Sequence, residues 1–174
     1  MTCDQVVRPR TRSAAVGSYL NHLPPDFRNY IVETKNVKAD GHCGFRAIAD
    51  LMGFGEDSWS RVRCDLMYEQ SHHTELYRSV FIEHFRTDAV MGVLGFFEDV
   101  APPEHWFTLP EMGYLVATAY NVCFVALTPK QSLTFFPLRT EVPPAPRCIC
   151  IALVNDNHFI EVHTSTFNTM IDDT

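Results

Sequence analysis

The residues best suited to chemistry lie in the turn Asp40-Gly41-His42-Cys43, directly ahead of an apolar stretch with helical spacing. A cysteine at a helix N-terminus faces unpaired backbone N–H groups and the positive end of the helix dipole. These groups favour a thiolate and offer donors to an oxyanion, and the glycine lets the amides up to Cys43 converge on one point. Although a free cysteine is usually a small buried hydrophobe, this turn therefore predicts a nucleophile for acyl transfer.

A candidate base for this thiol is His158, which follows the turn-forming run at 155–157. The run ends an apolar segment, so His158 is expected at the start of a strand, partly exposed at one end of a sheet. A lone histidine in such a place is more often solvent-facing or structurally hydrogen-bonded. Its distance from Cys43 in the sequence decides nothing, because catalytic groups assemble in space.

Helices are expected in the first part of the chain and strands in the last part, which is typical of an α+β domain. Helical spacing predicts helices at 43–52, from Asp57 or Ser58 to 70, at 75–85 and at 87–97, after a short helix or turn at 18–30. Thr108-Leu109-Pro110-Glu111 has the pattern of a capping box and predicts a helix start. Strands are expected at 31–37, 122–127, 133–136, 148–154 and 158–163.

The composition indicates one domain. With 174 residues, 46% of them hydrophobic and 12% aromatic, the chain can bury a substantial core, and no repeat or shift in composition marks a second domain. Residues 1–17 are polar, basic and without periodicity, so a flexible arm is expected there. The domain is expected at 18–164 and a tail at 165–174.

Charge and cysteine content exclude several classes of partner. A net charge of −7 argues against sequence-independent nucleic-acid binding, and no apolar run approaches the roughly 20 residues that cross a bilayer. The six cysteines are scattered, so a disulfide framework is unnecessary and a reducing compartment is expected. Cys148 and Cys150 lack a second cysteine pair that would indicate zinc. We expect an intracellular monomer, cytoplasmic or nuclear, without metal or cofactor and without a secretory signal.

Three motifs together resemble the ovarian-tumour (OTU) class of cysteine-dependent deubiquitinases. They occur in the family's order and cover most of the chain. Details at Gly44, at 53–59 and at 131–136 are most similar to OTU domains found beside transposon-derived sequences in plants and fungi. The residues that carry the resemblance are Asp40, Gly41, Cys43, Phe45, Arg46 and Ala47 in the first motif, Trp106 and residues 111–122 in the second, and Asn157, His158 and Phe159 in the third.

The resemblance implies a papain-like α+β fold with a small central, mostly antiparallel sheet packed between helical regions. It also implies that the Cys43 thiolate attacks the carbonyl after the C-terminal glycine of ubiquitin or a ubiquitin-like modifier, with His158 as base. Asp40 would support the oxyanion loop, and the oxyanion hole would be formed by the backbone of Gly41, His42 and Cys43. Ubiquitin or polyubiquitin chains, and other ubiquitin-like modifiers, are the implied partners.

Two positions depart from the family pattern. His42 stands where the family usually has asparagine, and Ile160 stands where many members have the Asn or Asp that orients the histidine. Isoleucine cannot accept an imidazole N–H, so an upstream amide or a two-residue mechanism must replace it. The candidates for that amide are Asn36, Asn155 and Asn157, of which we favour Asn155.

Substrate contacts are implied by the resemblance for Trp106, Asn157 and Phe159, although Trp106 can equally well pack under the helix that follows it. The surfaces at 56–103 and 128–146 would receive the body of ubiquitin. Carboxylates would suit the arginines ahead of its Gly-Gly tail. The candidates are Glu98, Asp99, Glu104 and Asp156.

Two other functions are compatible with these residues. A ubiquitin-binding module with weakened catalysis would follow if the substitutions at 42 and 160 had disabled the site. An unrelated papain-like thiol hydrolase would act on short peptides or small amides without ubiquitin.

Overall fold

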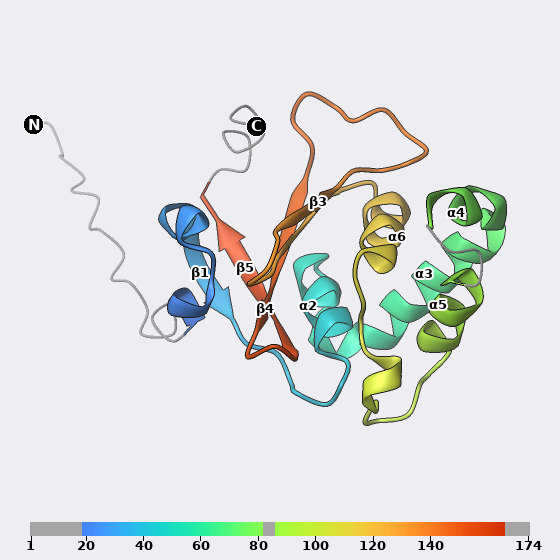
Figure 1. Cartoon of the computed structure of the whole chain (residues 1–174), viewed down its shortest axis with the longest axis horizontal. Helices are drawn as coiled ribbons and strands as arrows, with labels where there is room; N and C mark the ends of the chain where they lie inside the picture. Colours follow the sequence, from blue (N-terminus) through green and yellow to red (C-terminus); the bar gives the residue numbers. More distant parts are fainter. Residues whose placement is uncertain (1–18, 82–85, 166–174) are drawn as a thin grey trace, which may run out of the picture.

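A five-stranded sheet forms the centre of the structure (Figure 1). The structure is a computed structural model, which describes residues 19–81 and 86–165. The strand order is β1-β5-β4-β2-β3; β4 and β2 are parallel and the other three pairs are antiparallel. The expected mostly antiparallel sheet is therefore confirmed. The strands are β1 (Ile31–Lys35), β2 (Cys123–Leu127), β3 (Leu133–Phe135), β4 (Cys148–Val154) and β5 (His158–Thr164).

The helices lie mainly on one side of this sheet. Figure 1 shows α2 and α6 next to the strands, with α3, α4 and α5 further out. The α-helices are α2 (Cys43–Leu51), α3 (Trp59–His72), α4 (Thr74–Val80), α5 (Arg86–Leu94) and α6 (Glu111–Tyr120), and the 3-10 turns are η1 (Leu20–His22), η2 (Pro25–Tyr30), η3 (Glu56–Ser58) and η4 (Pro103–His105). The α+β class and the expected helices are confirmed, while α4 and α5 end earlier than the spacing indicated.

Both faces of the sheet are covered, which explains why β2 and β4 are apolar without alternation. Ile149 and Ile151 of β4 face the core shared with α2, α3 and α6. Cys150 and Ala152 face a second core that is closed by Leu23 and its neighbours in η1 and η2. The chain ahead of β1 therefore acts as a lid over the back of the sheet.

Helix α2 is packed from all sides, and residues 43–49 are buried along their whole length. It ends in a Schellman arrangement, with the Phe54 N–H donating to Ala49 O and the Gly53 N–H to Asp50 O. Gly53 has a φ of +84°, the left-handed conformation that this ending requires and that the sequence indicated.

The expected capping box ahead of α6 is wrong. The helix begins at Glu111 with Pro110 at the N-cap and without a side-chain cap. Thr108 is thus two residues too early to cap the first turn, and its amide instead donates to the Met112 sulfur at 3.5 Å. Glu111 pairs with Arg86 at 3.2 Å. The pattern marks the right region because proline and an acidic residue favour a first turn, but the helix begins two residues later than the box requires.

The expected arm at 1–17 and tail at 165–174 lie outside the described residues, apart from Ser165. Within the described ranges, none of the helices is both long and apolar enough to span a membrane.

Candidate active site

Cys43 is the first residue of α2, and its side chain meets the start of β5. The backbone N–H of Phe159 donates to the Cys43 sulfur at 3.4 Å. Burial raises the pKa of the thiol, while hydrogen bonds from the amides of Phe159 and Gly44 partly oppose that rise. The cysteine is 7% exposed, and it lines the two cavities described below. The fold therefore brings the predicted nucleophile to the predicted strand start.

His158 is the first residue of β5 and is half-buried. Its Nε2 lies 2.7 Å from Oδ1 of Asn36. An amide oxygen only accepts, so Nε2 carries the hydrogen and Nδ1 is left with the lone pair that a base needs. Burial lowers the pKa of His158, so the ring is neutral at neutral pH. The raised pKa of Cys43 likewise keeps its thiol protonated, so both groups are uncharged at rest.

The partner of His158 is Asn36 rather than Asn155, the residue that the sequence favoured. Asn155 has a φ of +53° in the turn before β5, and within residues 19–81 and 86–165 it makes no hydrogen bond to His158. β1 pairs antiparallel with β5 and places Lys35 opposite Glu161, so the residue after β1 lies beside the start of β5. Ile160 points into the core behind the sheet.

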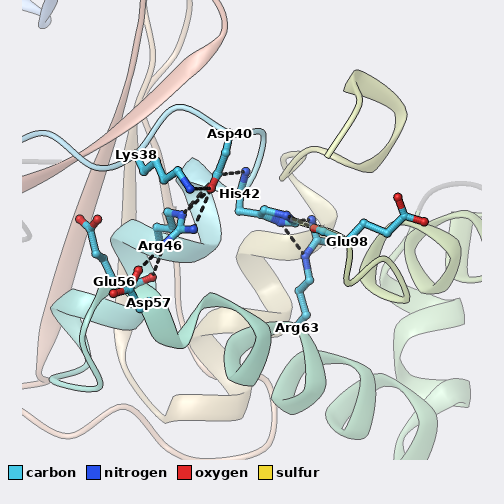
Figure 2. A network of polar contacts seen from close by, with 8 residues as sticks. All are labelled: Lys38, Asp40, His42, Arg46, Glu56, Asp57, Arg63 and Glu98. Atoms are coloured by element: carbon cyan, nitrogen blue, oxygen red, sulfur yellow. Dashed lines mark hydrogen bonds and ion pairs between the residues drawn. The ribbon is translucent and has the colours of Figure 1, made fainter. Parts of the chain in front are cut away.

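The turn at 40–43, in which the sequence predicts the oxyanion hole, is called the oxyanion turn. It is shaped by Asp40, whose carboxylate accepts from the His42 amide at 3.1 Å and from Arg46 Nη2 at 2.7 Å (Figure 2). Burial alone would raise the pKa of Asp40, but the hydrogen bonds from Arg46 and His42 outweigh it and the net shift is downward. The carbonyl of Asp40 also accepts from Ala101 N at 2.8 Å. Asp40 therefore stabilises the turn through both its side-chain carboxylate and its backbone carbonyl.

Two glycines allow the close approaches of this turn. Gly41 has a φ of +84°, and a Cβ there would lie 2.0 Å from the carbonyl oxygen of Ala101. A Cβ on Gly44 would lie 2.5 Å from Cβ of Phe107, whose ring packs edge-on against Phe45 and Phe159. The absence of a side chain at Gly44 thus allows Phe107 to pack against the start of α2.

His42 is fully buried, and its environment is one that the sequence did not reveal. Its ring stacks on Trp59 with centroids 3.6 Å apart. Nε2 lies 2.9 Å from the carbonyl of Glu98, and Nδ1 faces the guanidinium of Arg63 at 3.1 Å. Arg63 was missed because an arginine on a helix is usually solvated; the available signal was its place four residues after Trp59 and one after Val62, on the apolar face.

A groove of about 580 Å³ opens beside the cysteine. Trp106, Asn157 and Phe159, the predicted substrate residues, all line it, and the Trp106 indole N–H also donates to Ala101 O at 2.9 Å. Of the four candidate carboxylates, Asp156 is the one that lines this groove. Its lining consists of Cys43, Trp106, Phe107, Thr108, Leu109, Thr128, Pro129, Lys130, Leu153, Asp156, Asn157 and Phe159.

A second, smaller cavity of about 380 Å³ lies on the His158 side of the cysteine. Cys43, Trp106 and Asn157 line both cavities, so they mark the point at which the two meet. The described residues include no group of three or more His, Cys, Asp or Glu side chains placed to hold a metal ion. The remaining lining of the smaller cavity is Tyr19, Asn36, Ala39, Gly41, Asn155 and His158.

Comparison with solved structures identifies the fold. The OTU domain of OTUD1 is similar with a TM-score of 0.59 and 15% identity, over 86% of this chain and 95% of that one. The viral OTU domain protease from Farallon virus has a TM-score of 0.54 and 21% identity, over 78% of this chain and 85% of that one. The Hazara virus OTU, solved bound to ubiquitin, has a TM-score of 0.50 and 12% identity, over 79% and 84%.

The chain therefore has the OTU fold, as the three sequence motifs indicated. No protein-family model and no curated protein sequence matches it.

Replacing Gly41 by alanine should destabilise the domain more than the same change at Gly53. Both residues have a φ of +84°, but a Cβ at Gly53 meets nothing within 4 Å. We expect Gly53→Ala to lower the free energy of unfolding by about 1 kcal/mol through backbone strain, and Gly41→Ala by about 3 kcal/mol through the added collision. Urea unfolding measures both; equal losses would show that the Ala101 contact is not tight.

Two histidines of β5 should titrate on opposite sides of the usual value. Burial lowers the pKa of His158, whereas the hydrogen bond with Glu161 raises that of His163. A proton NMR titration should therefore give a midpoint below 6.5 for His158 and above 6.5 for His163. The reverse order would contradict the burial of the His158 ring.

Proposed function

We propose that this domain is a thiol-dependent hydrolase that cleaves the bond after the C-terminal glycine of ubiquitin or a ubiquitin-like modifier. The observation that carries the proposal is the meeting of Cys43, His158 and Asn36 at one cavity, with the Phe159 amide donating to the sulfur. Solved structures with this fold include viral OTU proteases and an OTU bound to ubiquitin. The fold and the three side chains support the same chemistry.

In the proposed first step the Cys43 sulfur bonds to the carbonyl carbon, and the carbonyl electron pair moves to oxygen. His158 accepts the thiol proton at Nδ1 and then protonates the leaving amine as the C–N bond breaks. The product is a thioester, which water attacks with His158 again as base, releasing the modifier's carboxylate and the thiol. Asn36 holds the Nε2–H and stabilises the imidazolium that forms between these events.

The resting protonation states favour a concerted transfer over a preformed ion pair. Because the pKa of Cys43 is raised and that of His158 is lowered, the thiol keeps its proton until the base receives it. The amide of Phe159, with the first amides of α2, then stabilises charge on the sulfur during attack. Because His158 carries no positive charge at rest, these amides take the place of an imidazolium in stabilising negative charge on the sulfur.

We assign the two cavities to the two sides of the scissile bond. The leaving amine must lie near His158, so the smaller cavity would receive the lysine side. The larger groove would receive the extended tail of the modifier, with Trp106 and Asn157 at the junction. Asp156, its acidic lining residue, is placed to attract an arginine of the tail.

The alternative of a binding module without catalysis rested on His42 and Ile160. The contact of His158 with Asn36 supplies the hydrogen bond that Ile160 cannot make. The buried partners of His42 accommodate its ring without displacing the turn. Neither departure therefore favours a disabled site.

The domain should release a fluorophore from the C-terminus of ubiquitin. Cys43→Ala should lower the rate at least about 10⁴-fold, because it removes the nucleophile. The control is Cys64→Ala, which changes an exposed cysteine and should leave the rate within about twofold. Noncovalent ubiquitin binding without turnover would support the module instead, and turnover of short unfolded peptides alone would support a papain-like hydrolase.

Removing Asn36 should slow turnover more than removing Asn155. We expect Asn36→Ala to lower kcat about 10- to 100-fold, because His158 loses the acceptor that fixes its tautomer, and Asn155→Ala to change kcat by less than about threefold. Steady-state kinetics on the ubiquitin substrate measure both. Equal effects would mean that Asn36 does not orient the base.

A further inference from the structure

The positively charged guanidinium of Arg63 lies in the core, under the oxyanion turn, and no step of the proposed reaction uses it. Its side chain is fully buried, yet among the described residues the guanidinium forms no ion pair with a carboxylate. Burial lowers its pKa to about 10, so it remains charged at neutral pH. A buried charge is costly unless its hydrogen bonds are satisfied. The groups that accept hydrogen bonds from Arg63 are therefore the groups that it holds in position.

Those contacts join three separate parts of the chain. Nη1 donates to the carbonyl of Val93 in α5 at 2.5 Å, and Nη2 donates to the carbonyl of His105 in η4 at 2.9 Å. Nε and Nη2 face Nδ1 of His42 at 3.3 and 3.1 Å. The guanidinium also lies 3.9 Å above the ring of Phe45 in α2. One side chain of α3 therefore spans α5, η4 and the residue before Cys43.

The contact with Arg63 selects one tautomer of His42. Arginine has only N–H donors, so Nδ1 must offer its lone pair and the hydrogen must be on Nε2. That hydrogen is donated to the carbonyl of Glu98 at 2.9 Å, and Figure 2 shows the Glu98 carboxylate directed away from the network. Burial, with the nearby charge of Arg63, lowers the pKa of His42 and keeps the ring neutral.

The segment at 95–106 is thereby fixed against the oxyanion turn at two points. The His42 ring holds the carbonyl of Glu98, and the Asp40 carbonyl holds the amide of Ala101. Ala101 in turn accepts the indole hydrogen of Trp106, which lines both cavities. A shift of His42 would therefore move the turn, the segment and the tryptophan together.

We propose that Arg63 is a positioning residue for the oxyanion hole, acting through the His42 tautomer that it selects. The proposal rests on the proposed hydrolase function, since it assigns Arg63 to the step in which negative charge develops on the carbonyl oxygen. Donors aimed at that oxygen lose effect when they are misplaced, so loss of Arg63 lowers kcat rather than substrate binding.

The test compares Arg63→Met with Arg61→Met, the same change at an exposed arginine of the same helix. With the fluorogenic ubiquitin substrate, Arg63→Met should lower kcat at least about tenfold while KM stays within about threefold. Arg61→Met should leave both constants unchanged. A lower kcat shared by both variants would overturn the proposal.

A second readout separates the oxyanion from the nucleophile. With ubiquitin that ends in an aldehyde, the sulfur bonds to the aldehyde carbon, and the carbonyl oxygen gains the electron pair and then the thiol's proton. With iodoacetamide, the thiol gives up its proton to His158 or water, the sulfur bonds to the methylene carbon, and iodide leaves with the electron pair of the C–I bond, so no oxyanion forms. Arg63→Met should weaken aldehyde capture at least about tenfold and change alkylation less than about threefold; equal losses would overturn the proposal.

Circular dichroism and thermal melting decide whether Arg63→Met is folded. If it is not, Arg63→Lys replaces it, because lysine keeps a charge but cannot bridge His42 and two carbonyls at once. A folded Arg63→Lys with wild-type kcat would overturn the proposal, and a selective loss of kcat and aldehyde capture would support it. An inactive wild-type domain would instead overturn the proposed function and this assignment with it.

Discussion

The packing of the N-terminus of α2 against the start of β5 is the arrangement on which the site depends. Helix α2 is buried on all sides, so its first residue cannot move without disturbing the core. The Phe159 amide lies at the start of β5, beyond the residues that pair with β1, and it donates to the Cys43 sulfur. One contact thus gives a backbone amide its acceptor and gives the sulfur of the proposed nucleophile a hydrogen-bond donor.

The turn ahead of α2 is supported by two arginines that work in different ways. Arg46 forms a buried ion pair with Asp40, and it also reaches Asp57 at the start of η3. Removing one partner of a buried pair typically costs about 3–5 kcal/mol, because the other charge is left without compensation. Arg63 instead donates hydrogen bonds to two backbone carbonyls and to the His42 imidazole, which fix its orientation without neutralising its charge.

Local patterns predicted the elements well because their signals are short in range. The helix that begins with Cys43 and the strand that begins with His158 were predicted from apolar spacing, β-branched residues and turn residues within a few positions. Local patterns could not select Asn36 among the three candidate amides, since its contact with His158 arises from the pairing of β1 with β5, more than a hundred residues apart. The buried state of Arg63 was equally hidden, because its acceptors are carbonyls, which every sequence offers equally.

The position of β1 at the edge of the sheet has a consequence for how the site is maintained. β1 is bonded to β5 along one side, whereas the helices and the other strands share the larger core. An edge strand opens at lower free energy than the centre of a fold, so the partner of His158 follows a strand that opens more readily than β4 or β5. The chain from η1 to Asn36 therefore contributes Leu23 and Ile31 to the core behind the sheet as well as the partner of His158, and a fragment that begins after Asn36 would lose both.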